Sequence, residues 1–391
     1  MTKSVAITLA ALLFASCGGV GQSAYAGAAA TAPSTSQAAT AVKYKVVEIP
    51  YLSPTSANFF TASCSVAAVN RHGVAVGSCQ QACNGCGGAQ VNPSERAWMY
   101  QERSGALDEL IFEPGEASAQ ATDISNEGII TGSGDAPSGP PEQPVLWTTS
   151  GGAVPLTGEF DALTEATAVN AHGTIVGTYT ASGAPGSEAV MWSGPNHVQT
   201  TLPGLECDHC TVTGLSVNAI DNRGTAVGQS LSNNGLLAVE WRSGTVTSLG
   251  SLQNSGTSDA FGINNKGDVV GSSNTKQVGP AGELTHAFLY HQGAMTDLGT
   301  LAGDTDSSAL SINGKGQIVG TSTNSVNSGR AFLDEDGQMF DLNTLIEPTS
   351  PLAGSIKLAT AVSISSNGWI AANGTDTRDH LSHAFLLIPV R

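Results

Sequence analysis

A segment that recurs seven times along the chain constrains its fold more than any other feature. Each copy has an Asn, Asp or Ser, a Gly three residues later, and then a short apolar run. The copies are AVNRHGVAVGS (68–78), DISNEGIITGS (123–133), AVNAHGTIVGT (168–178), AIDNRGTAVGQ (219–229), GINNKGDVVGS (262–272), SINGKGQIVGT (311–321) and SISSNGWIAAN (363–373). The first glycines lie at positions 73, 128, 173, 224, 267, 316 and 368, so the period is near fifty residues. A fixed period of this length is typical of propellers and other repeat architectures.

Two further elements accompany each copy of this segment. The first is AWMY (97–100), PVLW (144–147), AVMW (189–192), AVEW (238–241), HAFLY (286–290), RAFL (330–333) or HAFLL (383–387). The second follows a short turn in six copies: ALDELI, AVPLTG, VQTTLPGL, VTSLGSL, MTDLGTL and MFDLNTL. The seventh is missing after the last repeat, but KYKVVEIPYL (43–52) has the same alternating character and precedes the first repeat.

These elements predict an all-β, seven-bladed β-propeller over residues 43–391, built from four-stranded blades. Asn or Asp suits the start of a tight hairpin and Gly the positive φ at its end, so the first segment predicts a two-stranded hairpin. Four short strands at this period are characteristic of a propeller blade. We expect the N-terminal strand to complete the last blade, an arrangement that the rival open solenoid of hairpins does not explain.

The segment HAFLYHQGAMTDLGTLAGDTDSSALSINGKGQIVGTS (286–322) resembles the HAF-repeat family of bacterial extracellular proteins, named for a His-Ala-Phe tripeptide. The resemblance is specific in the last three repeats, degenerate in the first four, and covers nearly the whole chain after the N-terminal segment. It implies an exported, propeller-like repeat protein, and it carries no catalytic residues over to this chain.

The N-terminus has the pattern of an export signal. Lys3 precedes the apolar run VAITLAALLF (5–14), which is too short for a stable membrane span. FASC ends at Cys17 and resembles a bacterial lipobox, although Phe14 departs from the usual Leu; this predicts a signal peptide over 1–17 and lipidation of Cys17. The alternative is ordinary secretion after AYA, with a signal peptide over 1–26. The small, uncharged residues of 18–42 are typical of a flexible tether and favour the lipid anchor.

The other six cysteines are disulfide candidates, because the chain is predicted to be exported. Cys64 and Cys79 flank the first hairpin almost symmetrically and are expected to bridge it, although a bulge at Gly73 would shift their register by one residue. CNGC and CDHC predict two local pairs, Cys83 with Cys86 and Cys207 with Cys210. A zinc site and a redox site are the alternatives for these C-x-x-C elements.

Two other motifs favour structural interpretations. GKGQIVG (314–320) is similar to a nucleotide-binding loop, but the motif recurs seven times and its lysine position is Glu127 or Ala171 in other copies. A phosphate site therefore does not fit. The aromatic residues that end the third strand are expected to fill the space between blades; they are Tyr100, Trp147, Trp192, Trp241 and Tyr290.

The predicted blade layout gives the ring two different faces. The short-turn face carries the Asn-Gly turns and the turns between third and fourth strands. The long-loop face carries the remaining loops, and its ionisable residues are the ligand candidates: Glu206, Asp208, His209, Asp304, Asp306, Asp376, Asp379 and His380. No cofactor is predicted and no metal-binding residue is assigned. Ca²⁺ is kept as an alternative, because carboxylates one residue apart can bind it, although no twelve-residue calcium loop is present.

The sequence therefore predicts a binding or interaction scaffold that uses its long-loop face. Its formal net charge of −17 argues against nucleic acid as a partner. We expect a monomer that meets a protein or glycan partner at the cell envelope and touches the membrane only through its lipid anchor. It is predicted to be an outer-membrane lipoprotein, or otherwise periplasmic or secreted. The alternatives are an extracellular glycan lyase or hydrolase, with no catalytic residue that can be named, and a subunit of an outer-membrane assembly.

Overall fold

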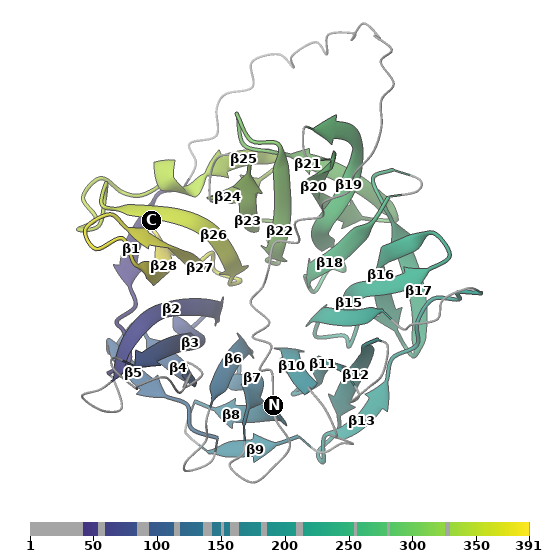
Figure 1. The fold of residues 1–391 in the computed structure, drawn as a ribbon, viewed down its shortest axis with the longest axis horizontal. Helices are drawn as coiled ribbons and strands as arrows, with labels where there is room; N and C mark the ends of the chain where they lie inside the picture. The colour runs from purple at the N-terminus through teal and green to yellow at the C-terminus, as the bar shows by residue number, and fades with distance from the viewer. Residues whose placement is uncertain are drawn as a thin grey trace, which may run out of the picture.

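The seven repeats form seven four-stranded antiparallel sheets around a common axis, so the protein is a seven-bladed β-propeller (Figure 1). This confirms the predicted fold class and blade composition. The computed structural model describes residues 42–53, 59–83, 94–112, 118–135, 143–149, 152–156, 164–180, 186–208, 214–253, 256–279, 282–324 and 329–390. The predicted signal peptide, Cys17 and almost all of the predicted tether lie outside these residues.

Each blade begins with the strand nearest the axis and ends with the strand at the rim (Figure 1). The first three blades are β2 (Phe59–Val69), β3 (Val74–Cys83), β4 (Ser94–Gln101) and β5 (Ala106–Glu109); β6 (Ala119–Ile124), β7 (Ile129–Gly134), β8 (Gln143–Thr148) and β9 (Ala153–Pro155); and β10 (Thr164–Val169), β11 (Ile175–Tyr179), β12 (Glu188–Ser193) and β13 (Val198–Thr201).

The next three blades follow the same order. They are β14 (Leu215–Ile220), β15 (Ala226–Ser232), β16 (Gly235–Arg242) and β17 (Thr245–Gly250); β18 (Ser258–Ile263), β19 (Val269–Gly279), β20 (Gly282–His291) and β21 (Ala294–Gly299); and β22 (Asp306–Ile312), β23 (Ile318–Thr323), β24 (Arg330–Glu335) and β25 (Gln338–Asp341). A 3-10 turn, η1 (Leu342–Thr344), follows the sixth blade and is the helical segment of the described chain.

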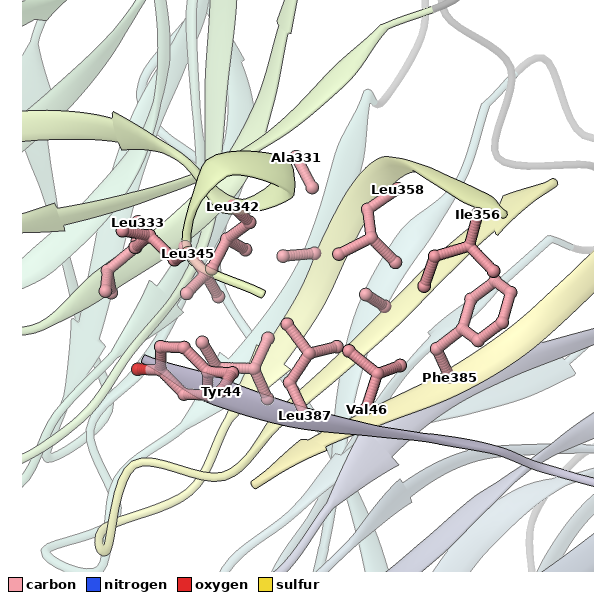
Figure 2. Packing of buried hydrophobic residues seen from close by; sticks show 14 of the residues in the cluster. Tyr44, Val46, Ala331, Leu333, Leu342, Leu345, Ile356, Leu358, Phe385 and Leu387 are labelled. Atoms are coloured by element: carbon pink, nitrogen blue, oxygen red, sulfur yellow. The ribbon is translucent and has the colours of Figure 1, made fainter. Parts of the chain in front are cut away.

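The seventh blade joins the two ends of the chain. It consists of β26 (Ile356–Ile364), β27 (Ile370–Asp376), β28 (Ser382–Pro389) and, at its rim, β1 (Tyr44–Glu48). The first strand pairs antiparallel with the last along its whole length, from Tyr44 opposite Pro389 to Glu48 opposite Phe385. Figure 2 shows Tyr44 and Val46 of β1 packed beside Leu387 and Phe385 in a cluster that also contains residues of the sixth blade. The predicted closure by the N-terminal strand is confirmed.

The apolar core lies between the blades. It divides into seven clusters of buried residues, each shared by two neighbouring blades. Trp147, Trp192 and Trp241 are at most 1% exposed and Tyr100 is 5% exposed, while Tyr290 is half-buried against one of the clusters. The prediction that these aromatic residues fill the inter-blade core is therefore confirmed.

The Asn-x-x-Gly steps are tight three-residue hairpin turns. In the sixth blade, the Asn313 side-chain oxygen accepts hydrogen bonds from the backbone N–H groups of Lys315 and Gln317. Gly316 has φ +88°, which L-residues rarely adopt, and the glycines at the other six turns also have positive φ. The repeated glycine is therefore required by the turn.

A β-bulge interrupts the inner strand of every blade three residues before the turn residue that Asn occupies in most copies. We call the unpaired residue the bulge residue. The seven bulge residues are Ala67, Thr122, Thr167, Asn218, Phe261, Leu310 and Val362. Because the extra residue is left unpaired, it re-aims its side chain away from the regular pleat.

The bulge also explains the outcome of the disulfide prediction. At the first turn, the three-residue loop ending at Gly73 shifts the register by one residue, and the bulge at Ala67 shifts it back. Cys64 then lies directly opposite Cys79, and the two are bonded. Cys207 is disulfide-bonded as well. Its predicted partner Cys210, the residue Cys86 and the Cys83 side chain lie outside the described part of the structure.

Candidate functional site

The inner strands of all seven blades surround a cavity of about 310 Å³ on the propeller axis. Each blade contributes the same segment, from its bulge residue to the first residues of its Asn turn. These turns form the short-turn face, so the cavity opens toward that face. We call it the axial cavity. Figure 1 looks down this axis, with β2, β6, β10, β18, β22 and β26 innermost.

Hydrogen bonds from blade to blade hold the frame of the cavity in place. At the turns, the Asn70 amide donates to the carbonyl oxygen of Ser125 at 3.2 Å, and the Asn313 amide donates to that of Ser365 at 3.1 Å. The ring is closed between the seventh and first blades, where Val66 N–H donates to Asn373 Oδ1 at 2.9 Å. Because these polar groups are paired, the inner strands form a pre-organised frame.

The bulge residues divide the cavity into two unlike walls. In blades two to four they are Thr122, Thr167 and Asn218, which with Asp123 form what we call the polar wall. In blades five, six, seven and one they are Phe261, Leu310, Val362 and Ala67, which form the apolar wall. Each group of blades is consecutive around the ring, so the two walls face each other across the axis (Figure 1).

Two carboxyl groups near the polar wall have raised pKa values. Burial raises the pKa of Asp123 to about 6, although its oxygens accept backbone N–H groups from Val169 at 2.9 Å and Ile124 at 2.8 Å. Burial likewise raises the pKa of Asp259 to about 7, against hydrogen bonds from the Asn218 amide and the Ala260 backbone. In both cases removal from water disfavours the charged form more than the hydrogen bonds favour it.

Asp221, which lines the cavity together with Asp123, occupies the Asn position of the fourth turn. It accepts backbone N–H groups from Arg223 and Thr225 at 2.9 and 2.8 Å, and it forms a 2.8 Å ion pair with the Arg223 guanidinium. Its oxygens are therefore used in the turn. Asp123 is the described carboxylate that lies on the wall itself.

The acidic loop residues proposed from the sequence lie elsewhere. None of those that the structure describes is among the residues that line the axial cavity. Asp304 pairs with Arg330 at 2.8 Å, and Asp306 accepts the backbone N–H of Thr285 at 2.9 Å. Asp208 is exposed and contacts Asn233, Glu206 is exposed, and His209 lies outside the described residues.

Asp376 is the last residue of β27, and Asp379 lies in the loop between β27 and β28. Hydrogen bonds from Arg378 lower the pKa of Asp376 to about 2. Asp379 accepts the backbone N–H of Leu381 and lies 3.0 Å from His383 Nε2, and both contacts lower its pKa. His380 is exposed in the same loop. These contacts order a surface loop at the closure of the ring.

The His383 contact belongs to a pattern that explains the HAF tripeptide. His383 is buried, and its Nδ1 lies 2.7 Å from Glu48 on the neighbouring rim strand β1. Three other blades pair a cationic or His side chain on the third strand with an acid on the fourth. These pairs are Arg96 with Glu109, His286 with Asp297, and Arg330 with Asp341. Such diagonal cross-strand pairs stabilise a sheet, so the first residue of the tripeptide has a structural role.

Sequence reasoning missed the bulge residues and Asp259, and it did not identify Asp123 as a candidate. The repeated segment aligns cleanly only from the residue after each bulge, where Ala68, Asp123 and Ser311 correspond. One residue earlier, the residue type ranges from Ala and Thr to Phe, which conveys no common chemistry. The position of these residues in the repeat could have identified them, because equivalent inner-strand residues of a propeller meet at its axis.

In the described part of the chain, no three His, Cys, Asp or Glu side chains come together as a set of metal ligands. Ca²⁺ binding therefore stays an untested alternative. No described helix is long and apolar enough to cross a membrane.

Comparison with solved structures agrees with the propeller fold. An acylaminoacyl peptidase from Pyrococcus horikoshii matches with a TM-score of 0.51 and 10% identity, over 84% of this chain and 51% of that one. Dipeptidyl peptidase 4 from Porphyromonas gingivalis matches at 0.42 and 11%, over 83% and 59%. TolB from Acinetobacter baumannii matches at 0.39 and 11%, over 76% of each chain. This chain thus spans just over half of the two peptidases. The sequence matches no protein-family model and no curated protein.

Proposed function

We propose that the protein is an exported, lipid-anchored binding module whose ligand enters the axial cavity from the short-turn face. This moves the expected ligand site from the long-loop face to the opposite side of the ring. The supporting observation is the cavity itself: about 310 Å³, framed by hydrogen-bonded strands, with one polar and one apolar wall. A largely pre-formed cavity of this size is typical of sites for small molecules.

The chemistry of the walls favours binding over hydrolysis. Glycoside hydrolysis requires two carboxyl groups placed on either side of the scissile bond. Among the described lining residues the carboxylates are Asp123 and Asp221, and the oxygens of Asp221 are used by its turn and by Arg223. A single available carboxyl group suits recognition of a ligand better than acid-base catalysis.

Export and lipidation rest on the N-terminal sequence, with the Cys64–Cys79 disulfide as support, because disulfides persist in oxidising compartments. The resemblance to HAF-repeat proteins points the same way. The test is mass spectrometry of the mature N-terminus. We expect an acylated Cys17, whereas a mature chain beginning at Gly27 would replace the lipid anchor by ordinary secretion.

The binding role is tested with glycan and peptide arrays and one cavity-filling variant. Ala67→Phe places on the apolar wall the residue type that the fifth blade carries at the same position, Phe261, so the bulge tolerates it. The matched control is Asp208→Asn, an exposed loop residue outside the cavity. We expect array binding to be lost in Ala67→Phe and kept in the control. Loss in the control alone would return the site to the long-loop face.

A further inference from the structure

The donors of the polar wall are already used between blades. The Thr122 hydroxyl donates to the carbonyl oxygen of Ala166 at 2.6 Å, and that of Thr167 donates to Val217 at 2.7 Å. Both N–H groups of the Asn218 amide are taken as well, by Asp259 at 3.0 Å and by the Ala260 carbonyl oxygen at 2.8 Å.

What this wall can offer a ligand is therefore acceptor capacity. The hydroxyl oxygens of Thr122 and Thr167 keep lone pairs, Asn218 keeps Oδ1, and Asp123 keeps the remaining lone pairs of its carboxylate. A ligand group that meets this wall must donate hydrogen bonds. A donor with positive charge gains most, because hydrogen bonds between charged groups are about twice as strong as neutral ones. The formal net charge of −17 also favours a positively charged ligand, because it attracts cations to the protein.

The opposite wall adds a second requirement. Phe261, Leu310 and Val362 are half-buried and turn apolar surface toward the cavity. The serines that follow Leu310 and Val362 accept backbone N–H groups of the next blade. A ligand that fills the cavity must therefore carry an apolar part on the side away from its donors.

We propose that the axial cavity binds a primary ammonium group that carries a short apolar chain, with the ammonium on Asp123, Thr167 and Asn218 and the chain against Phe261 and Leu310. This proposal deepens the proposed function and rests on it. Two sources share this chemistry: a free alkylamine, and the N-terminus of a peptide with an apolar first residue.

The test is isothermal titration of the folded protein at about pH 8, where the Asp123 carboxyl is ionised. The probes are n-hexylammonium, n-hexanol and hexanoate, which have the same chain and different head groups. We expect hexylammonium to bind at least about tenfold more tightly than either of the others, as for a charge-assisted hydrogen bond. The tripeptide Leu-Gly-Gly and its N-acetyl form then separate the two sources. If the ligand is a peptide N-terminus, Leu-Gly-Gly should bind and its N-acetyl form, which lacks the N-terminal charge, should not. If the ligand is a free alkylamine, hexylammonium should bind and neither peptide should.

Two variants assign the result to the wall. Asp123→Asn keeps the shape and should weaken hexylammonium binding about tenfold, while hexanol binding stays the same; Thr167→Val should act in the same direction. Asp208→Asn is the matched control and should change neither. Thermal unfolding of each variant establishes that it is folded.

The proposal is overturned if hexanoate or hexanol binds as tightly as hexylammonium, if Asp123→Asn has no effect, or if neither hexylammonium nor the peptide binds at millimolar concentration. These outcomes differ from failure of the proposed function. If a ligand from the array binds and Ala67→Phe prevents its binding, the axial cavity remains a binding site, but for another chemical class.

Discussion

Replacing Gly320 by alanine should destabilise the propeller much more than the same replacement at two other glycines of the segment SINGKGQIVGT. Gly320 lies on β23 directly opposite the bulged inner strand β22. A Cβ atom at Gly320 would lie 2.0 Å from the carbonyl oxygen of Ser308 and 2.9 Å from the Phe332 ring. Because the first contact is with backbone, the two strands must separate by about 1 Å, and overpacking of this kind costs about 3 kcal/mol.

The two comparison glycines isolate other effects. A Cβ at Gly314 meets no atom within 4 Å, so Gly314→Ala should be neutral. Gly316 also has open space, but its φ of +88° strains any L-residue, so Gly316→Ala should cost about 1 to 2 kcal/mol. The three variants thus separate open space, backbone strain and steric overlap within seven residues of chain.

The measurement is thermal unfolding followed by circular dichroism. With an unfolding entropy of about 2.1 cal/mol/K per residue, a loss of about 3 kcal/mol lowers Tm by about 4 °C for a propeller of this length. Gly316→Ala should lower it by about 1 to 3 °C and Gly314→Ala by less than about 1 °C. An equal response to Gly314→Ala and Gly320→Ala would refute the argument that inner-strand packing requires glycine at this position.

Three other changes probe the closure, the disulfide and a buried acid. Val46→Asp puts a charge on the buried face of β1 and should abolish cooperative urea unfolding or lower stability by at least about 3 kcal/mol, whereas Lys45→Asp on the exposed face should have little effect. Changing Cys64 and Cys79 to serine removes a cross-link between residues 15 apart and should lower the free energy of unfolding in urea by about 3 kcal/mol. If reductant lowers the stability of this double variant by the same amount, the effect belongs to another bond. The folded-state pKa of Asp259 is raised from 3.8 to about 7, so its protonation supports the fold fully below about pH 4 and this support is lost as the pH rises through 7. Asp259→Asn, which can still accept from Asn218, should therefore stabilise the protein by about 2 to 4 kcal/mol at about pH 8 and by little at about pH 4, and a pH-independent difference would contradict this.

The sequence contains the architecture because the architecture depends on local rules that repeat. Each turn needs a glycine such as Gly316 and a capping side chain such as Asn313. The last repeat lacks a fourth strand while an extra strand precedes the first repeat, so the ring closes when β1 pairs with β28. The Cys64–Cys79 bridge follows from symmetry about the first turn, although two register shifts that cancel were needed to produce it.

The axial cavity could not be predicted in the same way, because no local rule sets the residue type at the bulge. Thr167 and Leu310 occupy equivalent places and differ in polarity, so an alignment of the repeats gives no consensus there. The loop acids were chosen because their residue type suggested chemistry. Asp304 and Asp376 are instead paired with Arg330 and Arg378, which sequence spacing alone did not reveal.

The inner strands must satisfy two demands with the same few side chains: they join each blade to the next, and they face the cavity. In blades two and three the bulge residues Thr122 and Thr167 meet the first demand by donating to the next inner strand. In blade two the residue after the bulge contributes as well, since Asp123 accepts Val169 N–H at 2.9 Å. In blades six and seven, where the bulge residues have no polar side chain, the residue after the bulge makes this contact by itself: Ser311 accepts Ile364 N–H at 3.2 Å and Ser363 accepts Val69 N–H at 3.3 Å.

This difference determines what each wall can present to a ligand. Where the bulge residue joins the blades, its donor is used and only acceptors remain for the cavity. Where the next serine joins them, the bulge residue is released for an apolar side chain such as Leu310. Changes at Thr167 should therefore alter stability and ligand binding together, whereas Leu310→Ala should alter binding while leaving the hydrogen bonds between blades intact.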